Sequence, residues 1–288
     1  MKNIFQLTVI AIILSLIACR PEPLLIDIPP AKEQVVVFSQ IIPDQVMTVA
    51  LTRTIGALDF SEEEGDTLTA SLLDRLLVKD AKVWVTYRDL ADTLYPVTDG
   101  IYVSINTPQF VNEKYTLHVI TLEGDSLTAE TTMLPLVTFD HILPIIENDE
   151  GSLVTLDYKF KDFPENNWYM INIYTNGVAN NTEVNLNSLF DDGSKVLKRT
   201  ELLSDVAFGS EIIEGRLELP NVNPTDSMVV TLSAINETYC QYLELRKNGN
   251  NLFSAITKEP ISLPTNVEGG LGFFNTHFPD VHYFDLNE

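Results

Sequence analysis

Short runs in which apolar and polar residues alternate recur along most of the chain, and this period of two constrains the fold more than any other feature. Between Val83 and Tyr87, for example, Val83, Val85 and Tyr87 alternate with Trp84 and Thr86. Gly, Asp, Asn or Pro residues bound the runs, as they commonly bound β-strands. The pattern predicts a mainly β protein built from sandwiches.

The first half of the chain holds enough of these runs for one sandwich. We expect strands at 35–42, 46–55, 83–87, 100–105, 115–122 and 126–134. Pro43-Asp44 lies between the first two and favours a hairpin there. Leucines at helical spacing predict one short helix within residues 69–79. About six short strands in roughly 100 residues predict an immunoglobulin-like β-sandwich over residues 34–137.

The second half restarts the alternation after a pause between Pro135 and Pro144. Strands are expected at 153–160, 168–174, 215–219 and 228–235, with a polar excursion from Asn176 to Ser210 between the second and third of them. The sequence therefore predicts a second β-sandwich domain over residues 138–288.

One helix is well signalled, near residues 236–248. Asn236 is a suitable N-cap, Glu237 lies in the first turn, and Arg246 and Lys247 lie in the last. Acids at the start and bases at the end of a helix suit its dipole. Tyrosines and leucines at spacings of three and four give it an apolar face, so we expect it to pack over one sheet of the second sandwich.

The N-terminus has the organisation of an export signal. Lys2 is followed by an apolar run without another ionisable side chain before Cys19, and this run is shorter than the roughly 20 residues that a membrane span needs. Leu16-Ile17-Ala18-Cys19 resembles the lipobox of bacterial lipoproteins. The resemblance implies a signal peptide over residues 1–18, cleavage after Ala18 and acylation of Cys19.

Residues 19–33 then form a lipidated tether, because four prolines in this stretch favour an extended backbone. Each buried methylene of an acyl chain contributes about 0.8 kcal/mol, so several chains on Cys19 would hold the protein on a membrane without crossing it. The sequence therefore predicts a lipid-anchored protein.

Charge and cysteine content narrow the function classes further. The chain has 18 basic and 41 acidic residues and a net charge of −23, which excludes nucleic-acid binding because that depends on basic residues facing phosphates. Lipidation of Cys19 leaves Cys240 as the only thiol, so an internal disulfide is excluded and core packing must stabilise the fold. Between Tyr239 and Tyr242, Cys240 is predicted to be a buried, inert thiol.

Two groups of residues suggest metal binding weakly. His277, Asp280, His282 and Asp285 fall within nine residues and would suit a terminal metal loop, although a surface tail anchored by aromatic side chains is the favoured interpretation. Those aromatic side chains are Phe278, Tyr283 and Phe284. The segments Asn148–Gly151 and Asp191–Ser194 place oxygen ligands beside a glycine, but turn chemistry explains both without calcium.

The glycine-rich segment Gly269-Gly270-Leu271-Gly272 lacks the Lys-Ser or Lys-Thr of a phosphate loop. We expect its glycines to let the backbone bend or approach a neighbour closely, with Phe273 and Phe274 pinning the segment to the core. Gly270→Val should then abolish folding rather than remove one binding activity selectively.

Catalytic patterns are not apparent in the sequence. There is no Gly-x-Ser-x-Gly, His-x-x-x-His or Cys-x-x-Cys, and 41 acids offer too many arbitrary pairs to nominate one. We predict no catalytic residue, no metal site and no cofactor.

Several short motifs, taken in order, resemble a family of Bacteroidota outer-membrane lipoproteins known as domain of unknown function 4249. These motifs are Val35–Ser39, Leu51–Thr54, Val78–Val83, Leu127–Thr131 and, as the most specific, Asn266–Phe274. The resemblance implies an outer-membrane lipoprotein, often encoded beside TonB-dependent receptors, without established activity or catalytic residues. Arg20-Pro21-Glu22-Pro23 lacks the compact acidic tract that resembles a surface-export signal, so the periplasmic and cell-surface faces both stay open.

Three functions follow as hypotheses. The leading one is a non-catalytic accessory lipoprotein that binds a partner or ligand and works with a TonB-dependent transporter. The second is an envelope hydrolase whose site assembles from scattered residues, which a perturbed carboxylate or histidine in a cleft would support. The third is a structural subunit of an envelope machine, which the lack of a concave ligand pocket together with one large exposed apolar patch would support.

Overall fold

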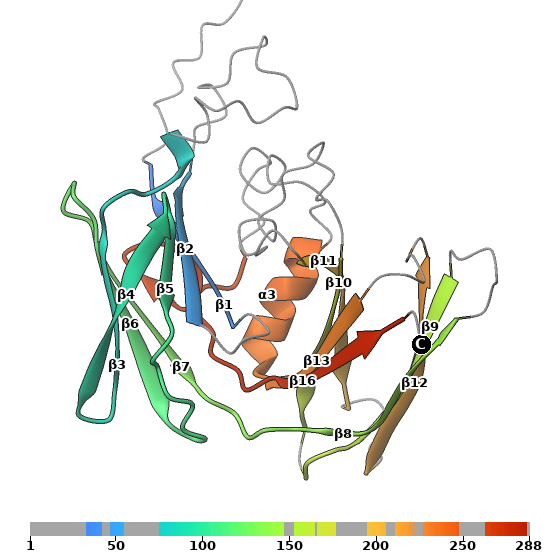
Figure 1. Cartoon of the computed structure of the whole chain (residues 1–288). Coiled ribbons are helices and arrows are strands. Elements are labelled where there is room, and N and C mark those ends of the chain that lie inside the picture. Colours follow the sequence, from blue (N-terminus) through green and yellow to red (C-terminus); the bar gives the residue numbers. More distant parts are fainter. Residues whose placement is uncertain are drawn as a thin grey trace, which may run out of the picture. The chain divides into compact units, whose positions relative to one another are not determined.

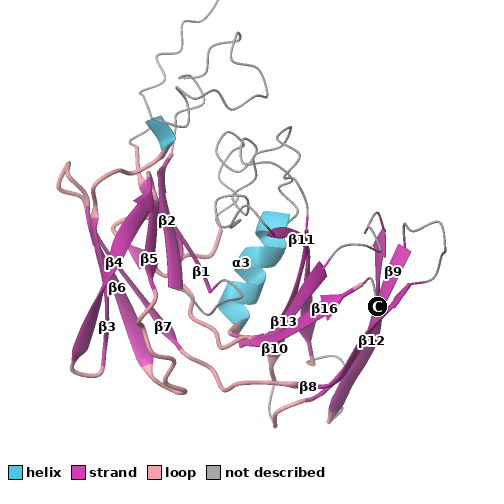
Figure 2. Cartoon of the chain, viewed as in Figure 1, coloured by secondary structure: helices cyan, strands magenta, loops and turns pink. Residues whose placement is uncertain are grey.

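The computed structural model describes residues 33–41, 47–54, 75–146, 153–164, 166–176, 195–205, 211–220, 222, 227–247 and 263–286. Residues Lys32–Glu288 form one compact unit. The described backbone is mainly β with one long helix, as Figures 1 and 2 show. The predicted fold class, a β-sandwich protein, is confirmed.

Seven consecutive strands form the first sandwich. One layer contains β1 (Val35–Ile41), β2 (Met47–Arg53) and β5 (Ile101–Ser104), and the other contains β3 (Lys82–Tyr87), β6 (Lys114–Ile120) and β7 (Ser126–Thr132). This grouping is that of the A-B-E and C-F-G strands of immunoglobulin-type sandwiches. The alternation read from the sequence places one face of each strand in the core, as in β3, where Val83, Val85 and Tyr87 are buried.

The strand β4 (Leu90–Thr98) joins the two layers on one side (Figure 1). Its first half, Leu90–Leu94, pairs with β3, and its second half, Tyr95–Thr98, pairs with β5. A register shift between Pro96 and Thr98 lets the strand bend as it changes layers.

A C-terminal segment joins the same two layers on the other side. The strand β14 (Val267–Glu268) pairs antiparallel with β7, and β15 (Leu271–Phe273) pairs parallel with β1. Only Gly269 and Gly270 lie between these strands. One nine-stranded sheet therefore runs from β14 to β15 and nearly closes on itself.

The second sandwich repeats the strand order of the first. Its smaller sheet contains β8 (Phe139–Ile146), β9 (Leu153–Lys161) and β12 (Ile212–Pro220), and its larger sheet contains β10 (Trp168–Asn176), β11 (Lys195–Ser204), β13 (Ser227–Ile235) and β16 (Asp280–Asp285). The first, second and fifth strands form one sheet, and the fourth, third, sixth and seventh form the other, as in β1–β7. Buried aromatic and aliphatic side chains such as Phe160, Tyr169 and Leu232 fill the space between the sheets.

The helix α3 (Glu237–Lys247) follows β13 directly and lies against β10 (Figure 2). The Asn236 side chain accepts a hydrogen bond from Tyr239 N at 2.8 Å, which confirms the predicted N-cap. Tyr239 and Tyr242 are buried and share an apolar cluster with Phe38 and Met170. The helix thus packs against strands of both sandwiches.

Several strands were missing from the sequence prediction. The pause at 135–144 contains most of β8, and the polar excursion from Asn176 to Ser210 contains β11. Both are edge strands, which carry charges and proline more freely than central strands do. The expected terminal surface tail is wrong, because residues 280–285 form β16 and pair with β13.

The short helix expected at 69–79 is described only from Arg75 onward. Arg75 and Leu76 are helical, and Leu77 then forms a bridge with Thr52. The rest of that helix and the Pro43-Asp44 turn lie outside the described residues. The division into domains at residue 137 stays a prediction, to which the structure adds that β14 and β15 pair with strands of the first sandwich.

Candidate functional site

The histidines singled out in the sequence do not come together. His277 is 1% exposed, and its Nδ1 lies 3.4 Å from Asn275 Nδ2. His282 lies on β16 with its Nε2 3.0 Å from Asp280 Oδ2, and Asp280 also accepts a hydrogen bond from Phe139 N. Asp285, at the end of β16, is exposed. In the described ranges, no three His, Cys, Asp or Glu side chains are grouped to hold a metal ion.

Buried polar side chains beside the start of α3 bind the C-terminal segment instead. Ser39 Oγ donates to Asn275 O at 3.0 Å and accepts from Asn275 N at 2.6 Å. The helix-capping Asn236 donates from Nδ2 to Asn275 Oδ1 at 3.4 Å. These bonds connect β1, α3 and the residues after β15, so this network holds elements of both sandwiches in register.

The glycine-rich segment is held by close backbone contacts. A Cβ at Gly272, whose φ is +94°, would collide with the carbonyl oxygen of Val37, and one at Gly270 would lie 2.6 Å from Val35 O. Phe273 and Phe274 are 2% and 0% exposed. The close approach and the aromatic anchors predicted from the sequence are both confirmed, and the segment closes the first sandwich. The segments Asn148–Gly151 and Asp191–Ser194 lie outside the described residues.

Cys240 is buried in α3, as predicted. Burial raises the pKa of its thiol to about 11, so the thiolate is rare at neutral pH. Since the thiolate is the nucleophilic form, the side chain behaves as a small apolar group in the helix core.

A pair of buried carboxyl groups in the second sandwich was missed by the sequence analysis. Asp162 follows β9 and Asp205 follows β11, and they are 8% and 6% exposed. The Tyr169 hydroxyl donates to Asp162 Oδ1 and accepts from Phe163 N, while Asn167 N donates to Asp205 Oδ1 at 2.7 Å. Each Asp is isolated in sequence among 41 acidic residues, so no local spacing could have identified the pair.

The environment of Asp162 favours its protonated form. Burial raises the pKa of Asp162, the hydrogen bond from Tyr169 opposes the increase, and the neighbouring Asp205 carboxyl adds to it. Two adjacent carboxylates in a buried place disfavour ionisation of both. The chemistry that this site offers is therefore reversible proton uptake by Asp162.

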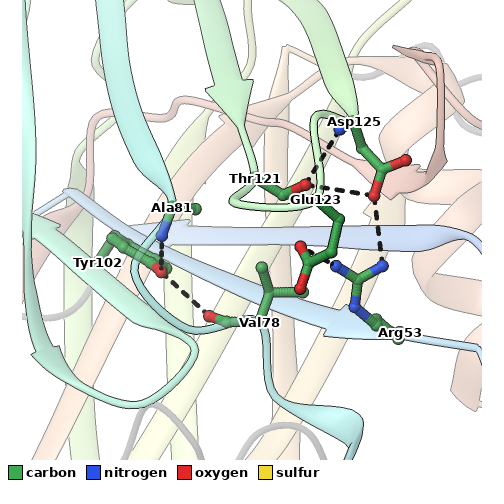
Figure 3. Close-up of polar contacts among 7 residues, drawn as sticks. All are labelled: Arg53, Val78, Ala81, Tyr102, Thr121, Glu123 and Asp125. Atoms are coloured by element: carbon green, nitrogen blue, oxygen red, sulfur yellow. Dashed lines mark hydrogen bonds and ion pairs between the residues drawn. The ribbon is translucent and has the colours of Figure 1, made fainter.

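The chain enters the first sandwich at an end that is fixed by hydrogen bonds. Gln34 N donates to Thr54 Oγ1 and Thr54 N donates to Gln34 O, both at 2.9 Å. The neighbouring Arg53 lies between Glu123 and Asp125 of the β6–β7 turn, at 2.5 and 3.3 Å (Figure 3). This end, defined by Gln34, Arg53 and the β6–β7 turn, is called the entry end below.

Figure 3 also shows a tyrosine that holds the chain after the described helical residues. The Tyr102 hydroxyl donates to Val78 O at 3.0 Å and accepts from Ala81 N at 2.9 Å. Val78 N in turn donates to Leu51 O. Two motifs singled out in the sequence, Leu51–Thr54 and Val78–Val83, are therefore adjacent and serve the packing of the first sandwich.

Three exposed apolar side chains lie on β4 and just after β5. Tyr95 and Val97 on β4 are 68% and 64% exposed, and Ile105 just after β5 is 77% exposed. Tyr95 pairs with Val103 of β5, two residues before Ile105. These three residues form the apolar strip, and exposed apolar groups of this kind mark contact surfaces when they are contiguous.

Comparison with known proteins gives a family match. The family model described as "Domain of unknown function (DUF4249)" matches residues 21–277. No curated protein matches the chain. Within the described residues, no helix has both the length and the hydropathy of a membrane span.

Proposed function

Because the chain belongs to the family of domain of unknown function DUF4249, we propose that it is a lipoprotein of the Bacteroidota outer membrane that binds a protein partner without catalysing a reaction. Cys19 carries the lipid, residues 20–33 form the tether, and the two sandwiches form the binding body. A TonB-dependent transporter is the partner to test first. The proposal covers both the periplasmic and the cell-surface face.

The observation that carries this proposal is the apolar strip, which has three side chains and is therefore smaller than the one large apolar patch expected of a structural subunit. Tyr95 and Val97 on β4 and Ile105 just after β5 are each more than 60% exposed, on a chain whose net charge is −23. A strongly acidic protein remains soluble without exposing such side chains, whereas a partner would remove them from water. Aromatic and aliphatic anchors contribute most of the energy at protein interfaces.

Lipid attachment is tested by Cys19→Ser. The wild-type protein should fractionate with the outer membrane, and the variant should be released into the soluble fraction because it has no acyl acceptor. Membrane fractionation of Cys19→Ser that matches the wild type would contradict the anchor.

Partner binding is tested by co-purification from detergent-solubilised membranes. Tagged protein should recover a transporter component, and Ile105→Glu should reduce that recovery because it places a charge in the apolar strip. Ile212→Glu is the matched control, since Ile212 is a 44% exposed isoleucine on β12 of the second sandwich. Recovery of the wild-type protein alone under mild conditions would contradict partner binding.

The rival proposal of an envelope hydrolase draws its support from the perturbed carboxyl of Asp162. Both Asp162 and Asp205 are less than one tenth exposed, however, and their oxygens accept hydrogen bonds from Tyr169 and Asn167. Such groups are committed to the structure around them. We therefore assign the pair to the local structure of the loops that it connects and not to catalysis.

A further inference from the structure

The entry end of the first sandwich is the part of the fold closest along the chain to the lipidated cysteine. Residues 20–33 separate Cys19 from Gln34. Val35 pairs with Arg53, so β1 begins where β2 ends. Arg53 contacts the β6–β7 turn, and that turn therefore lies beside the point at which the tether meets the fold (Figure 3).

The β6–β7 turn carries an exposed leucine on a rigid frame. Leu122 is 71% exposed, and Ile120 before it is 40% exposed. Thr121 and Asp125 bond reciprocally, because Asp125 N donates to Thr121 Oγ1 at 3.1 Å and Thr121 Oγ1 donates to Asp125 Oδ2 at 3.2 Å. The leucine is thus presented to solvent by a turn whose shape is already fixed.

The turn is also less acidic than its sequence suggests. Arg53 is within ion-pair distance of both Glu123 and Asp125, and its own side chain is only 15% exposed. Unpaired carboxylates would be repelled by anionic lipid headgroups. The Arg53 cation pairs with both Glu123 and Asp125 and lowers the negative charge of the turn. Electrostatic repulsion between the turn and a lipid surface is therefore weaker than the net charge of −23 on the whole chain would suggest.

The tether joins the lipid to the entry end and not to the opposite end. With the extended backbone that its four prolines favour, a tether of the length of residues 20–33 reaches about 43 Å at most. The strand β6 has 7 residues, so the opposite end of the sandwich lies roughly 23 Å further along the strand direction. Ile105 belongs to that opposite end, because it follows Ser104, which pairs with Met47 at the start of β2.

We propose that the β6–β7 turn is a membrane-contact site in which Leu122 enters the interfacial region of the lipid bilayer. The site orients the first sandwich so that its entry end faces the lipid and the end that carries Ile105 faces away. This inference rests on the proposed lipidation of Cys19. It assigns the contact to Leu122 and Ile120, and the ligand to a phospholipid surface.

The test compares two labelled cysteine variants of the full-length lipidated protein. Leu122→Cys and Ile105→Cys have similar exposure, 71% and 77% for the native side chains, at opposite ends of the same sandwich. Cys240 is buried and reacts little, and Cys19 is acylated. Each variant is labelled with an environment-sensitive fluorophore and bound to vesicles of phosphatidylethanolamine and phosphatidylglycerol.

On vesicle binding, emission from the label at position 122 should shift to the blue and should be quenched by a quencher attached to the lipid. The label at position 105 should show neither change. Equal responses at both positions, a response at position 105 alone, or no response at position 122 would each overturn the proposed orientation.

Flotation of the same vesicles separates this inference from the proposed function. If the wild-type protein floats but the emission of the label at position 122 does not shift, the lipid anchor is supported and the membrane-contact site is overturned. Wild-type protein that does not float overturns the anchor, and the orientation falls with it. Leu122→Asp should float as the wild type does, because the acyl chains carry most of the affinity.

Discussion

The two sandwiches share one strand order, yet they are closed by different means. In the first, β4 pairs with both layers on one side and the β14–β15 segment pairs with both on the other. In the second, Arg199 of β11 reaches across to the Glu218 carbonyl of β12 at 3.0 Å, and Phe139 N of β8 donates to Asp280 of β16 at 2.9 Å. Backbone pairing closes the first sandwich, whereas side-chain bonds bridge the edges of the second.

The same contrast appears in two buried tyrosines near strand starts. Tyr115 of β6 donates to Pro108 O at 2.6 Å and accepts from Phe110 N at 2.8 Å, as in the tyrosine corner of immunoglobulin-type domains. Tyr169 of β10 bonds Phe163 N in the same way, but its hydroxyl donates to the carboxyl of Asp162. A carbonyl acceptor does not titrate and a carboxyl does, so pH should act on the second sandwich more than on the first.

The largest loss of stability is expected from a substitution that disrupts the pairing of β15 with β1 in the first sandwich. Gly272→Ala should destabilise the protein by more than about 3 kcal/mol or prevent folding, because the new Cβ meets the Val37 backbone. Gly124→Ala is the control, since Gly124 has the same φ of +94° but nothing within 4 Å of the added Cβ. It should cost only about 1 kcal/mol for the left-handed backbone. Denaturant unfolding measures both, and equal losses would contradict the close approach.

A smaller effect concerns the proton of Asp162 in the second sandwich. Because the folded-state pKa of Asp162 is raised, the stability that its proton contributes is fully present below the unfolded pKa of about 3.9 and is lost as pH rises through the folded-state value. Asp162→Asn should therefore stabilise the protein at pH 7, because the amide has no charge to bury. This gain should shrink as pH falls towards 4.

Thermal unfolding at several pH values measures the Asp162→Asn effect, with Tyr115→Phe as the comparison. Tyr115→Phe removes two hydrogen bonds, for a loss of about 1–2 kcal/mol. That loss should vary little over the acid range, because the Tyr115 hydroxyl bonds a backbone amide and a backbone carbonyl and no carboxyl. A gain from Asp162→Asn that is constant with pH would contradict the raised pKa of Asp162.

The smallest effect concerns the side-chain bridge between β11 and β12. Arg199→Met keeps the apolar stem and removes the bonds to Glu218 O and Glu201, so we expect a loss of about 0.5–1 kcal/mol. Arg216→Met is the matched control, because Arg216 forms an exposed pair with Asp157 within the same sheet. Its unfolding midpoint should stay close to that of the wild type. Equal losses of stability for the two variants would contradict the claim that the Arg199 bonds between the two sheets contribute more than a surface ion pair within one sheet.

Much of the fold could be predicted because alternation and helix capping are local. The strands over 83–87, 115–122 and 126–134 and the Asn236 cap depend on residues close together in the sequence, and each is present. The edge strands β8 and β11 were not predicted, because charges and proline interrupt their pattern where solvent tolerates them. The two sandwiches have the same strand order, but this could not be predicted. Strand order depends on which strands pair, and the alternation of apolar and polar residues does not specify the pairs.

The features of the candidate site divide in the same way. The close backbone approach of the glycine-rich segment could be predicted, because glycine has no Cβ. Its pairing with β1 on one side and with β7 on the other could not be predicted from the sequence. The Asp162–Asp205 pair and the contact of Arg53 with the β6–β7 turn join residues from distant strands. Nothing local in the sequence distinguishes these acids from the others in the chain.

The central claim is that the C-terminal segment from β14 to Asn275, which closes the first sandwich and contacts the start of α3, joins the two sandwiches into one cooperative unit. The chain has 2 tryptophans, Trp84 on β3 of the first sandwich and Trp168 on β10 of the second. Single-tryptophan variants, Trp84→Phe and Trp168→Phe, therefore report on each sandwich separately. Phe274, which follows β15 and is 0% exposed in the core of the first sandwich, supplies the perturbation.

The decisive measurement is denaturant unfolding of both single-tryptophan variants with and without Phe274→Ala. We predict one midpoint for the two reporters, and a loss of about 3–5 kcal/mol that both of them register after Phe274→Ala. Separate midpoints, or a loss seen by Trp84 while Trp168 is unchanged, would contradict the claim that the segment makes the two sandwiches one unit.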